Sequence, residues 1–118
     1  MRLQAASMAR EIRQGVHDEK EMILIPELLR PGDKAVDIGS NYAMVTYHLS
    51  RAVGSSGLVY AFEPIPFPFL VSKMIARKLS LDNVVFHGMG CADVAGKIPF
   101  TVPLQPGGAP SAGQSHIA

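Results

Sequence analysis

The stretch "AVDIGSNYAMVTYHL", residues 35–49, joins a predicted strand to a predicted helix. Residues 35–38 form a short β-type run that Gly39 ends, and Asp37 is the only charged residue within it. Residues 43–53 then place apolar side chains at helical spacing. The predicted buried face of this helix carries Val45, Leu49, Ala52 and Val53. An acid near the end of an otherwise apolar strand has two readings: it caps the following loop through its carboxylate, or it belongs to a site, and only its placement together with Gly39 and Glu63 favours the site.

The sequence on both sides continues the alternation of strands and helices. Residues 58–62 (LVYAF) and 84–87 (VVFH) are predicted strands of the apolar type that parallel sheets bury on both faces. A helix is predicted after Pro66, with a buried stripe at Leu70, Val71, Met74 and Ile75. This order predicts an α/β protein with a doubly wound, Rossmann-like sheet, truncated after about three to four strands. Right-handed crossovers would place the second strand beside the first and the third beyond it.

Three segments are expected along the chain. Residues 1–30 form an N-terminal helical segment, in which residues 4–14 are weakly helical and residues 18–29 have a helix signature that Pro26 kinks or breaks. Residues 31–102 hold the sheet, with one more short strand predicted over residues 97–102. Residues 103–118 are rich in Gly, Pro, Ser and Ala, which predicts a flexible tail.

Composition limits the classes of function. The 118 residues suffice for one domain, and the interspersed charges, net +1, argue against nucleic-acid binding. The N-terminus lacks a signal-peptide core and no apolar run is long enough to span a membrane, so we expect a soluble, cytoplasmic protein. The single cysteine, Cys91, excludes an internal disulfide framework and is interpreted as a small buried hydrophobe.

Polar and small residues follow the predicted strands at the edge where open α/β sheets bind ligands. Gly39 allows a tight turn and a close approach of a ligand, and Asn41 tolerates left-handed backbone geometry. Glu63 ends the second strand, 24 residues after Gly39. An acid about 20 residues beyond the first glycine is where such sheets bind a ribose diol.

A nicotinamide dinucleotide fits this geometry less well than a cationic ligand does. Dinucleotide sites use G-x-G-x-x-G to seat a pyrophosphate, whereas the turn here reads Gly-Ser-Asn-Tyr-Ala over residues 39–43. Asp37 would also place a negative charge beside the pyrophosphate. S-adenosylmethionine has an ammonium, a sulfonium and a ribose but no phosphate, and it is the cofactor that these residues favour.

Residues 31–93 resemble the opening half of the FkbM-type S-adenosylmethionine-dependent methyltransferases. The matching stretches are "RPGDKAVDIGSNYAMVT", "LSRAVGSSGLVYAFEPIPFPF" and "LDNVVFHGMGCAD", about half of the chain. The family pattern D-[VI]-G-A-N-x-G-x-x-T is matched at Asp37, Ile38, Gly39, Asn41 and Thr46, and V-Y-A-F-E-P-x-P-x-x-F is matched over residues 59–69. Two positions depart from the first pattern, because Ala43 replaces its second glycine and the bulky Tyr42 precedes it.

The resemblance implies a class I methyltransferase fold and methyl transfer to the hydroxyl oxygen of a small-molecule acceptor. Asp37 and Gly39 would lie against the methionine part of the cofactor, Glu63 would bind the ribose hydroxyls, and Met89 and Gly90 would border the adenine. No catalytic residue is assigned, because the base that takes the hydroxyl proton is expected in a part of the family's domain that has no counterpart here.

The family continues through further strands and an acidic motif that this sequence lacks before it ends at Ala118. The sequence therefore reads as an N-terminal fragment, expected to be inactive alone and to self-associate through an open sheet edge. Two alternatives stay open: a cofactor-binding remnant without catalysis, and a fragment of an NAD-dependent Rossmann dehydrogenase.

The histidines give no metal site. His17, Asp18 and Glu19 are contiguous, and contiguous residues rarely converge on one ion, so they are interpreted as a solvated helix start. His48 is expected either to be exposed to solvent on its helix or to have hydrogen-bond partners there. His87 ends the third strand and is a candidate for supporting the site from behind the residues that touch the ligand.

Overall fold

The computed structural model describes residues 1–104, 106, 116 and 117. In chain order its elements are α1 (Arg2–Arg13), the 3-10 helix η1 (Lys20–Leu24), α2 (Ile25–Leu28), β1 (Lys34–Ile38), α3 (Met44–Val53), β2 (Leu58–Phe62), α4 (Pro66–Lys78), β3 (Val84–His87), β4 (Phe100–Thr101) and β5 (His116–Ile117).

The central sheet is parallel and has the order β1-β2-β3. Asp37 pairs in register with Ala61, and Ala61 pairs with Phe86. The predicted α/β class, the three strands and their order are therefore confirmed. Because all three strands run the same way, their carboxyl ends meet at one edge of the sheet.

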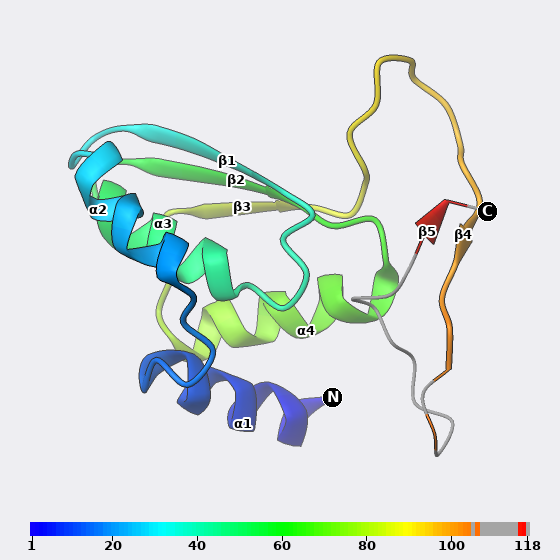
Figure 1. Cartoon of the computed structure of the whole chain (residues 1–118), viewed down its shortest axis with the longest axis horizontal. Coiled ribbons are helices and arrows are strands. Elements are labelled where there is room, and N and C mark those ends of the chain that lie inside the picture. The colour runs from blue at the N-terminus through cyan, green and yellow to red at the C-terminus, as the bar shows by residue number, and fades with distance from the viewer. Residues whose placement is uncertain (105, 107–115, 118) are drawn as a thin grey trace.

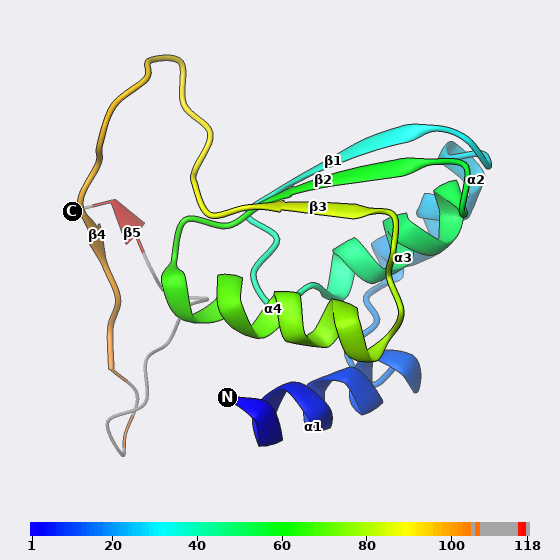
Figure 2. The ribbon, with the colours of Figure 1, turned by 180° about the vertical axis from the view of Figure 1, so that it is seen from behind.

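α1, α3 and α4 lie in layers beneath one face of this sheet (Figure 1). α3 and α4 cover that face, and α1 packs against α4 on the side away from the strands, as the view from behind also shows (Figure 2). Ala5 and Ala9 are one helical turn apart on α1, and their small side chains let the two helices approach closely. They form one buried cluster with Ile12 of α1, Ala43, and Val71 and Ile75 of α4.

The buried face of α3 differs from the predicted one. Its buried residues are Thr46, Ser50 and Val53, while the predicted Val45, Leu49 and Ala52 are only partly buried. The two polar residues are buried because each has a partner. Ser50 Oγ donates to Asn83 Oδ1 at 2.5 Å, and the Asn83 amide donates to the carbonyls of Ser50 and Gly54.

Several peripheral predictions need correction. Residues 18–29 do not form one helix, since the 3-10 helix η1 runs directly into the short α2, which has Pro26 in its first turn. Of residues 97–102 only 100–101 are in a strand, which pairs antiparallel with β5 outside the central sheet. Cys91 is exposed, so its interpretation as a buried hydrophobe was wrong.

The predicted flexible tail lies largely outside the described residues. Within it the structure describes Pro103, Leu104, Pro106 and β5. The boundaries proposed after residues 30 and 102 stay predictions. Among the residues that are described, no helix has both the length and the apolar character needed to cross a membrane.

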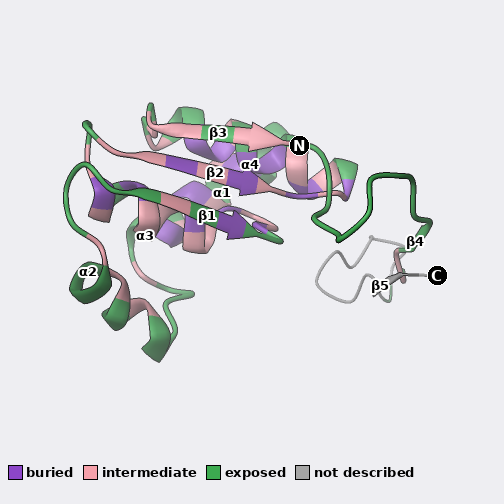
Figure 3. Cartoon of the chain, turned by 90° about the horizontal axis from the view of Figure 1, so that it is seen from above, coloured by how far each residue is buried: buried purple, intermediate pink, exposed green. Residues whose placement is uncertain are grey.

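The other face of the sheet is bare within the described part of the chain. Figure 3 looks onto this face, and no helix lies in front of its strands. Val36 and Ile38 of β1 are 58% and 66% exposed, and Val85 of β3 is also exposed. β1 is an edge strand, since β2 is its only partner among the described strands. The expected open edge is therefore present.

We predict that this edge and face drive self-association of the 118-residue chain. The double substitution Val36→Lys and Ile38→Lys should lower the mass measured by light scattering, because two charges at an edge strand oppose strand pairing. The fold should be retained, since both side chains are already exposed. Leu3→Lys, at an exposed apolar position on α1, is the control. A mass unchanged by the double substitution would contradict the prediction.

Candidate functional site

Glu63 ties together the segments that follow β1 and β2. Its Oε2 accepts a hydrogen bond from the Asn41 amide at 2.8 Å, and its Oε1 accepts one from the Ile65 amide at 2.9 Å. The residue is only 5% exposed. These two amides offset part of the cost of burying the carboxylate. Each oxygen keeps a further acceptor position, so the group can still receive hydroxyl donors.

The loop after β1 is held by backbone bonds to the end of β2. The amides of Gly39 and Ser40 both donate to the carbonyl of Phe62 at 2.9 Å. Gly39 has φ +77, and a Cβ placed on it would meet nothing within 4 Å. A glycine is therefore favoured here by its backbone angle, and the space in front of it is open to a ligand.

Two non-glycine residues of this loop are also left-handed. Asn41 has φ +48, which asparagine tolerates, as the sequence indicated. Ala43 has φ +66 and caps α3 in the left-handed conformation. This is the position of the family's second glycine. The left-handed conformation strains an alanine, and the methyl group of Ala43 is fully buried in the cluster with residues of α1 and α4.

Asp37 is buried on the helix side of the sheet and bonds to α3. The Thr46 hydroxyl donates to Asp37 Oδ2 at 2.6 Å. Burial raises the pKa of the Asp37 carboxyl above its ordinary value, and the hydrogen bond from Thr46 opposes this rise. The matched aspartate and threonine of the sequence pattern are therefore direct partners.

Met89 and Gly90 lie in the exposed segment after β3. A Cβ on Gly90 would lie 3.7 Å from Pro64, the residue that follows Glu63. The structure thus brings this segment beside the end of β2, where the adenine end of the predicted ligand was expected. Asp37, Gly39, Asn41 and Glu63 come to the same edge of the sheet, and the ligand role of all six residues stays a prediction.

A cavity of about 500 Å³ lies against the loop of residues 39–42, and we name it the loop cavity. α1 contributes Met8 and Ile12 to it, and the following segment contributes His17 and Glu19. No signal in the sequence predicts that these last two residues belong here, because the pattern around them is typical of a solvated helix start. The packing of α1 against α4 brings His17 and Glu19 to the loop of residues 39–42, and no sequence motif indicates that packing.

The polarity of the loop cavity favours a cationic ligand. No lysine or arginine is among the described residues that line it, whereas Glu19 is. The negative charge of Glu63 reaches Tyr42 on its wall: burial raises the pKa of the Tyr42 phenol, and Glu63 raises it further. Ser40 Oγ and Asn41 Oδ1 are buried and have no partner within the described part of the chain. Both oxygens therefore lack the hydrogen bond that a buried polar atom usually makes.

His17, His48 and His87 each contact another side chain. His17 Nε2 lies 2.8 Å from Glu11 Oε2, and His48 Nε2 lies 2.7 Å from Asp18 Oδ1. His87 stacks on Phe62, with ring centroids 4.8 Å apart, and its strand register places it on the bare face of the sheet. Within the described ranges no group of three or more His, Cys, Asp or Glu side chains is placed to hold a metal ion.

The fold and this edge of the sheet define a Rossmann-like α/β domain of the kind found in class I methyltransferases. Solved structures of S-adenosylmethionine-dependent enzymes match it. A SAM-dependent O-methyltransferase from Thermotoga maritima is 26% identical with a TM-score of 0.58, covering 68% of this chain and 33% of its own. A protein-L-isoaspartate O-methyltransferase is 28% identical with a TM-score of 0.55, covering 58% and 22%.

A third match, a proposed rRNA methylase from Clostridium thermocellum, is 24% identical with a TM-score of 0.58 and supports the fold alone. It covers 60% of this chain and 39% of its own. The chain thus spans well under half of the length of these proteins. No protein-family model matches the chain, and no curated protein does. The resemblance is therefore to S-adenosylmethionine-dependent methyltransferases in general, and the FkbM family is not specifically shown.

We predict that Asp37→Asn stabilises the domain at neutral pH. A raised pKa means that the folded state binds a proton more tightly than the unfolded state, so Asp37 favours folding at low pH. This contribution is lost as the pH rises through the raised pKa. Asparagine carries no charge and can still accept the bond from Thr46. Urea unfolding at pH 7 should therefore give a larger free energy of unfolding for the variant.

The advantage of the variant should shrink as the pH falls toward about 4, where the aspartate of the unfolded chain is itself protonated. Asp93→Asn, at an exposed position, should show no such trend. A variant that is less stable than the parent at pH 7 would mean that the buried carboxylate is net stabilising.

Proposed function

We propose that this chain carries the cofactor half of an S-adenosylmethionine-dependent methyltransferase that methylates a hydroxyl oxygen. One arrangement carries the proposal: the Glu63 carboxylate, held by the Asn41 and Ile65 amides, lies beside the open turn at Gly39. A ribose diol and a small cation are the groups that such an edge can hold. The finer assignment to an FkbM-type enzyme is supported by the sequence patterns around Asp37 and Glu63.

The residues present fit this cofactor. Glu63 has acceptor positions left for two hydroxyls, and the open space at Gly39 admits a ligand to the backbone. Met89 and Gly90 would border the adenine. When bound, S-adenosylmethionine supplies a methyl group on a sulfonium sulfur, ready for in-line transfer to a nucleophilic oxygen.

The work of this chain would be binding and alignment. Asp37, fixed by Thr46, and Glu63, fixed by two amides, are held by their partners before any ligand arrives. Such preorganisation lowers the entropic cost of bringing two reactants into line. Met8, Ile12 and Tyr42 would exclude water from part of the loop cavity. The acceptor and the base that takes its proton are not assigned to residues here.

We predict that Glu63→Ala weakens binding of S-adenosylhomocysteine, measured by calorimetry on the 118-residue chain. The loss should equal about two charge-assisted hydrogen bonds, each worth roughly 1.5–3 kcal/mol. NADH should bind more weakly than S-adenosylhomocysteine to the unsubstituted chain, which separates the proposal from the dehydrogenase alternative.

Glu63 also holds two backbone amides, so the variant needs a structural control. Its free energy of unfolding should be measured in parallel, because each amide left unpaired costs about 1–3 kcal/mol. Binding should be tested at a temperature where the variant is folded. Glu27→Ala, at an exposed acid on α2, should change neither quantity. A folded Glu63→Ala variant with unchanged affinity would remove Glu63 from the site.

We further predict that the 118-residue chain binds the cofactor weakly and transfers no methyl group. β1 has no strand on its free edge within the described residues, so the acceptor side of the site lacks a wall. A radiolabelled methyl-transfer assay against a panel of hydroxyl compounds measures this, with the solved O-methyltransferase of Thermotoga maritima as positive control. Robust turnover by the chain alone would contradict the prediction and leave the methyltransferase proposal stronger.

A further inference from the structure

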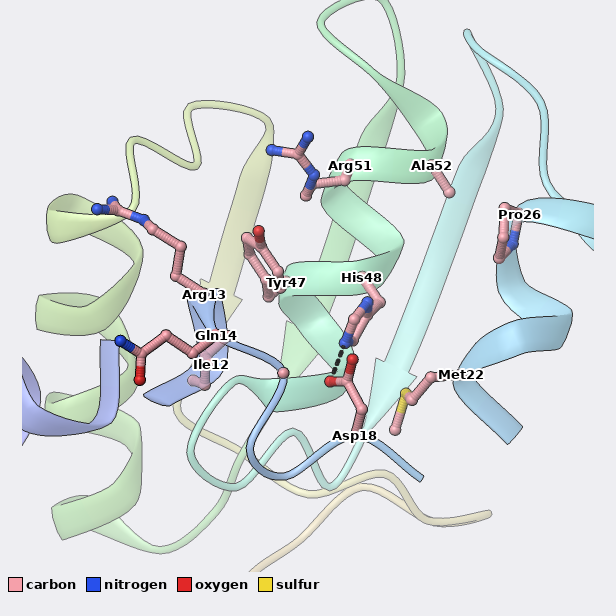
Figure 4. Close-up of a pocket in the computed structure, with 11 residues that line it drawn as sticks. Ile12, Arg13, Gln14, Asp18, Met22, Pro26, Tyr47, His48, Arg51 and Ala52 are labelled. Atoms are coloured by element: carbon pink, nitrogen blue, oxygen red, sulfur yellow. Dashed lines mark hydrogen bonds and ion pairs between the residues drawn. The ribbon is translucent and has the colours of Figure 1, made fainter. Parts of the chain in front are cut away.

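A second cavity of about 500 Å³ lies behind the segment that closes the loop cavity. Figure 4 shows it between the end of α1, the η1–α2 segment and α3. We name it the arginine cavity, after Arg13 and Arg51, the two arginines that line it. Its volume is within the range of small-molecule sites. Nothing in the proposed methyl transfer uses it.

The strap, residues 14–19, separates the two cavities and faces each with different side chains. Asp18 points to the arginine cavity, while His17 and Glu19, its neighbours in the chain, line the loop cavity. A turn at Gly15, with φ +73, brings Asp18 into place, and the Asp18 amide donates to the Gly15 carbonyl at 3.2 Å. The two cavities are neighbours that share Ile12 and no other described lining residue.

The charge of the arginine cavity is positive. Asp18 is the only acid among its described lining residues, and it is engaged with His48 at 2.7 Å. Arg51 and Arg13 outnumber it. The Arg13 side chain extends toward α4, where it donates to the Lys78 carbonyl at 3.5 Å, so Arg51 is the guanidinium placed to bind an anion.

A flat aromatic surface lies beside one of these charges. The Arg51 guanidinium carbon is 5.7 Å from the centre of the Tyr47 ring, and Figure 4 shows both side chains on the same side of α3. Met22 and Pro26 line the opposite wall, and Ala52 adds a further apolar surface. A ligand bound beside Arg51 would therefore contact a guanidinium and the Tyr47 ring at the same time.

We propose that the arginine cavity binds a small aromatic carboxylate. A guanidinium presents parallel N–H groups that match a carboxylate, and a ring on the same ligand can pack against the Tyr47 ring beside Arg51. Inorganic phosphate fits less well, for two reasons. Its second negative charge is repelled by Asp18, and an ion of its size leaves most of the cavity and all of its apolar wall unused.

The test is a titration of the isotopically labelled 118-residue chain, followed by its amide nuclear magnetic resonance signals. Benzoate is the probe; benzamide lacks its charge, acetate lacks its ring, and inorganic phosphate is the competing anion. We expect saturable shifts for benzoate at the amides of Gln14, Tyr47 and Arg51. Benzamide, acetate and phosphate should each bind about tenfold more weakly, the loss of roughly one directed interaction.

Two variants locate the site. Arg51→Gln and Tyr47→Leu should each weaken benzoate binding about tenfold, while Arg51→Lys, which keeps the charge but not the fork, should fall between. Arg77→Gln removes an arginine of α4 that lines neither cavity and should leave binding unchanged. Arg51 is exposed, so its replacement should not unfold the domain, and the dispersion of the amide spectrum checks this.

Several results would overturn the proposal. Phosphate or benzamide binding as tightly as benzoate would mean that the ring and the carboxylate are not recognised together. Equal losses in Arg51→Gln and Arg77→Gln would mean nonspecific charge attraction. Saturating S-adenosylhomocysteine should leave the benzoate shifts in place, because the cavities are distinct. Displacement of benzoate by S-adenosylhomocysteine would mean that both ligands bind at one site, which contradicts the proposal. Absence of any S-adenosylhomocysteine binding would count against the methyltransferase proposal alone.

Discussion

The buried carboxylate of Glu63 is the group on which this edge of the domain depends. A carboxylate that is 5% exposed is costly unless hydrogen bonds offset its lost hydration. Its two amide partners come from the loop after β1 and from the N-cap of α4. Satisfying one charge therefore fixes two segments that are distant in sequence. The Phe62 carbonyl accepts from the amides of Gly39 and Ser40, which ties the start of the same loop to the end of β2.

The strands and their order could be predicted from the sequence, because apolar runs and glycine turns are local signals. The position of Asp37 and Glu63 followed as well, since parallel strands bring their carboxyl ends together. The buried face of α3 could not be predicted from hydropathy. Thr46 and Ser50 are buried through partners on other elements, Asp37 and Asn83, and a helical pattern read alone ranks them as solvent-facing. The position of His17 and Glu19 at the loop cavity could not be predicted either, because it depends on how α1 packs against α4.

The strap shows how a few polar residues can give neighbouring cavities opposite charge. The chain leaves the turn of residues 14–17 at Asp18, and Glu19 has extended backbone angles, φ −103 and ψ 164. His17 and Glu19 share one side and Asp18 takes the other. The acid on the loop side adds to a surface that already favours cations. The acid on the other side is engaged with His48, so the arginines there remain dominant.

The bare face of the sheet bears on the site as well as on stability. Val36, Ile38 and Val85 give these strands apolar side chains on a face that the described helices do not cover, as in parallel sheets buried on both sides. Ile38 directly precedes Gly39, whose open space is part of the candidate site. Any partner or further chain that covers Ile38 must therefore approach the turn itself. A partner on this face and a ligand at Gly39 would then meet at adjacent residues, so the binding of one is expected to change the affinity for the other.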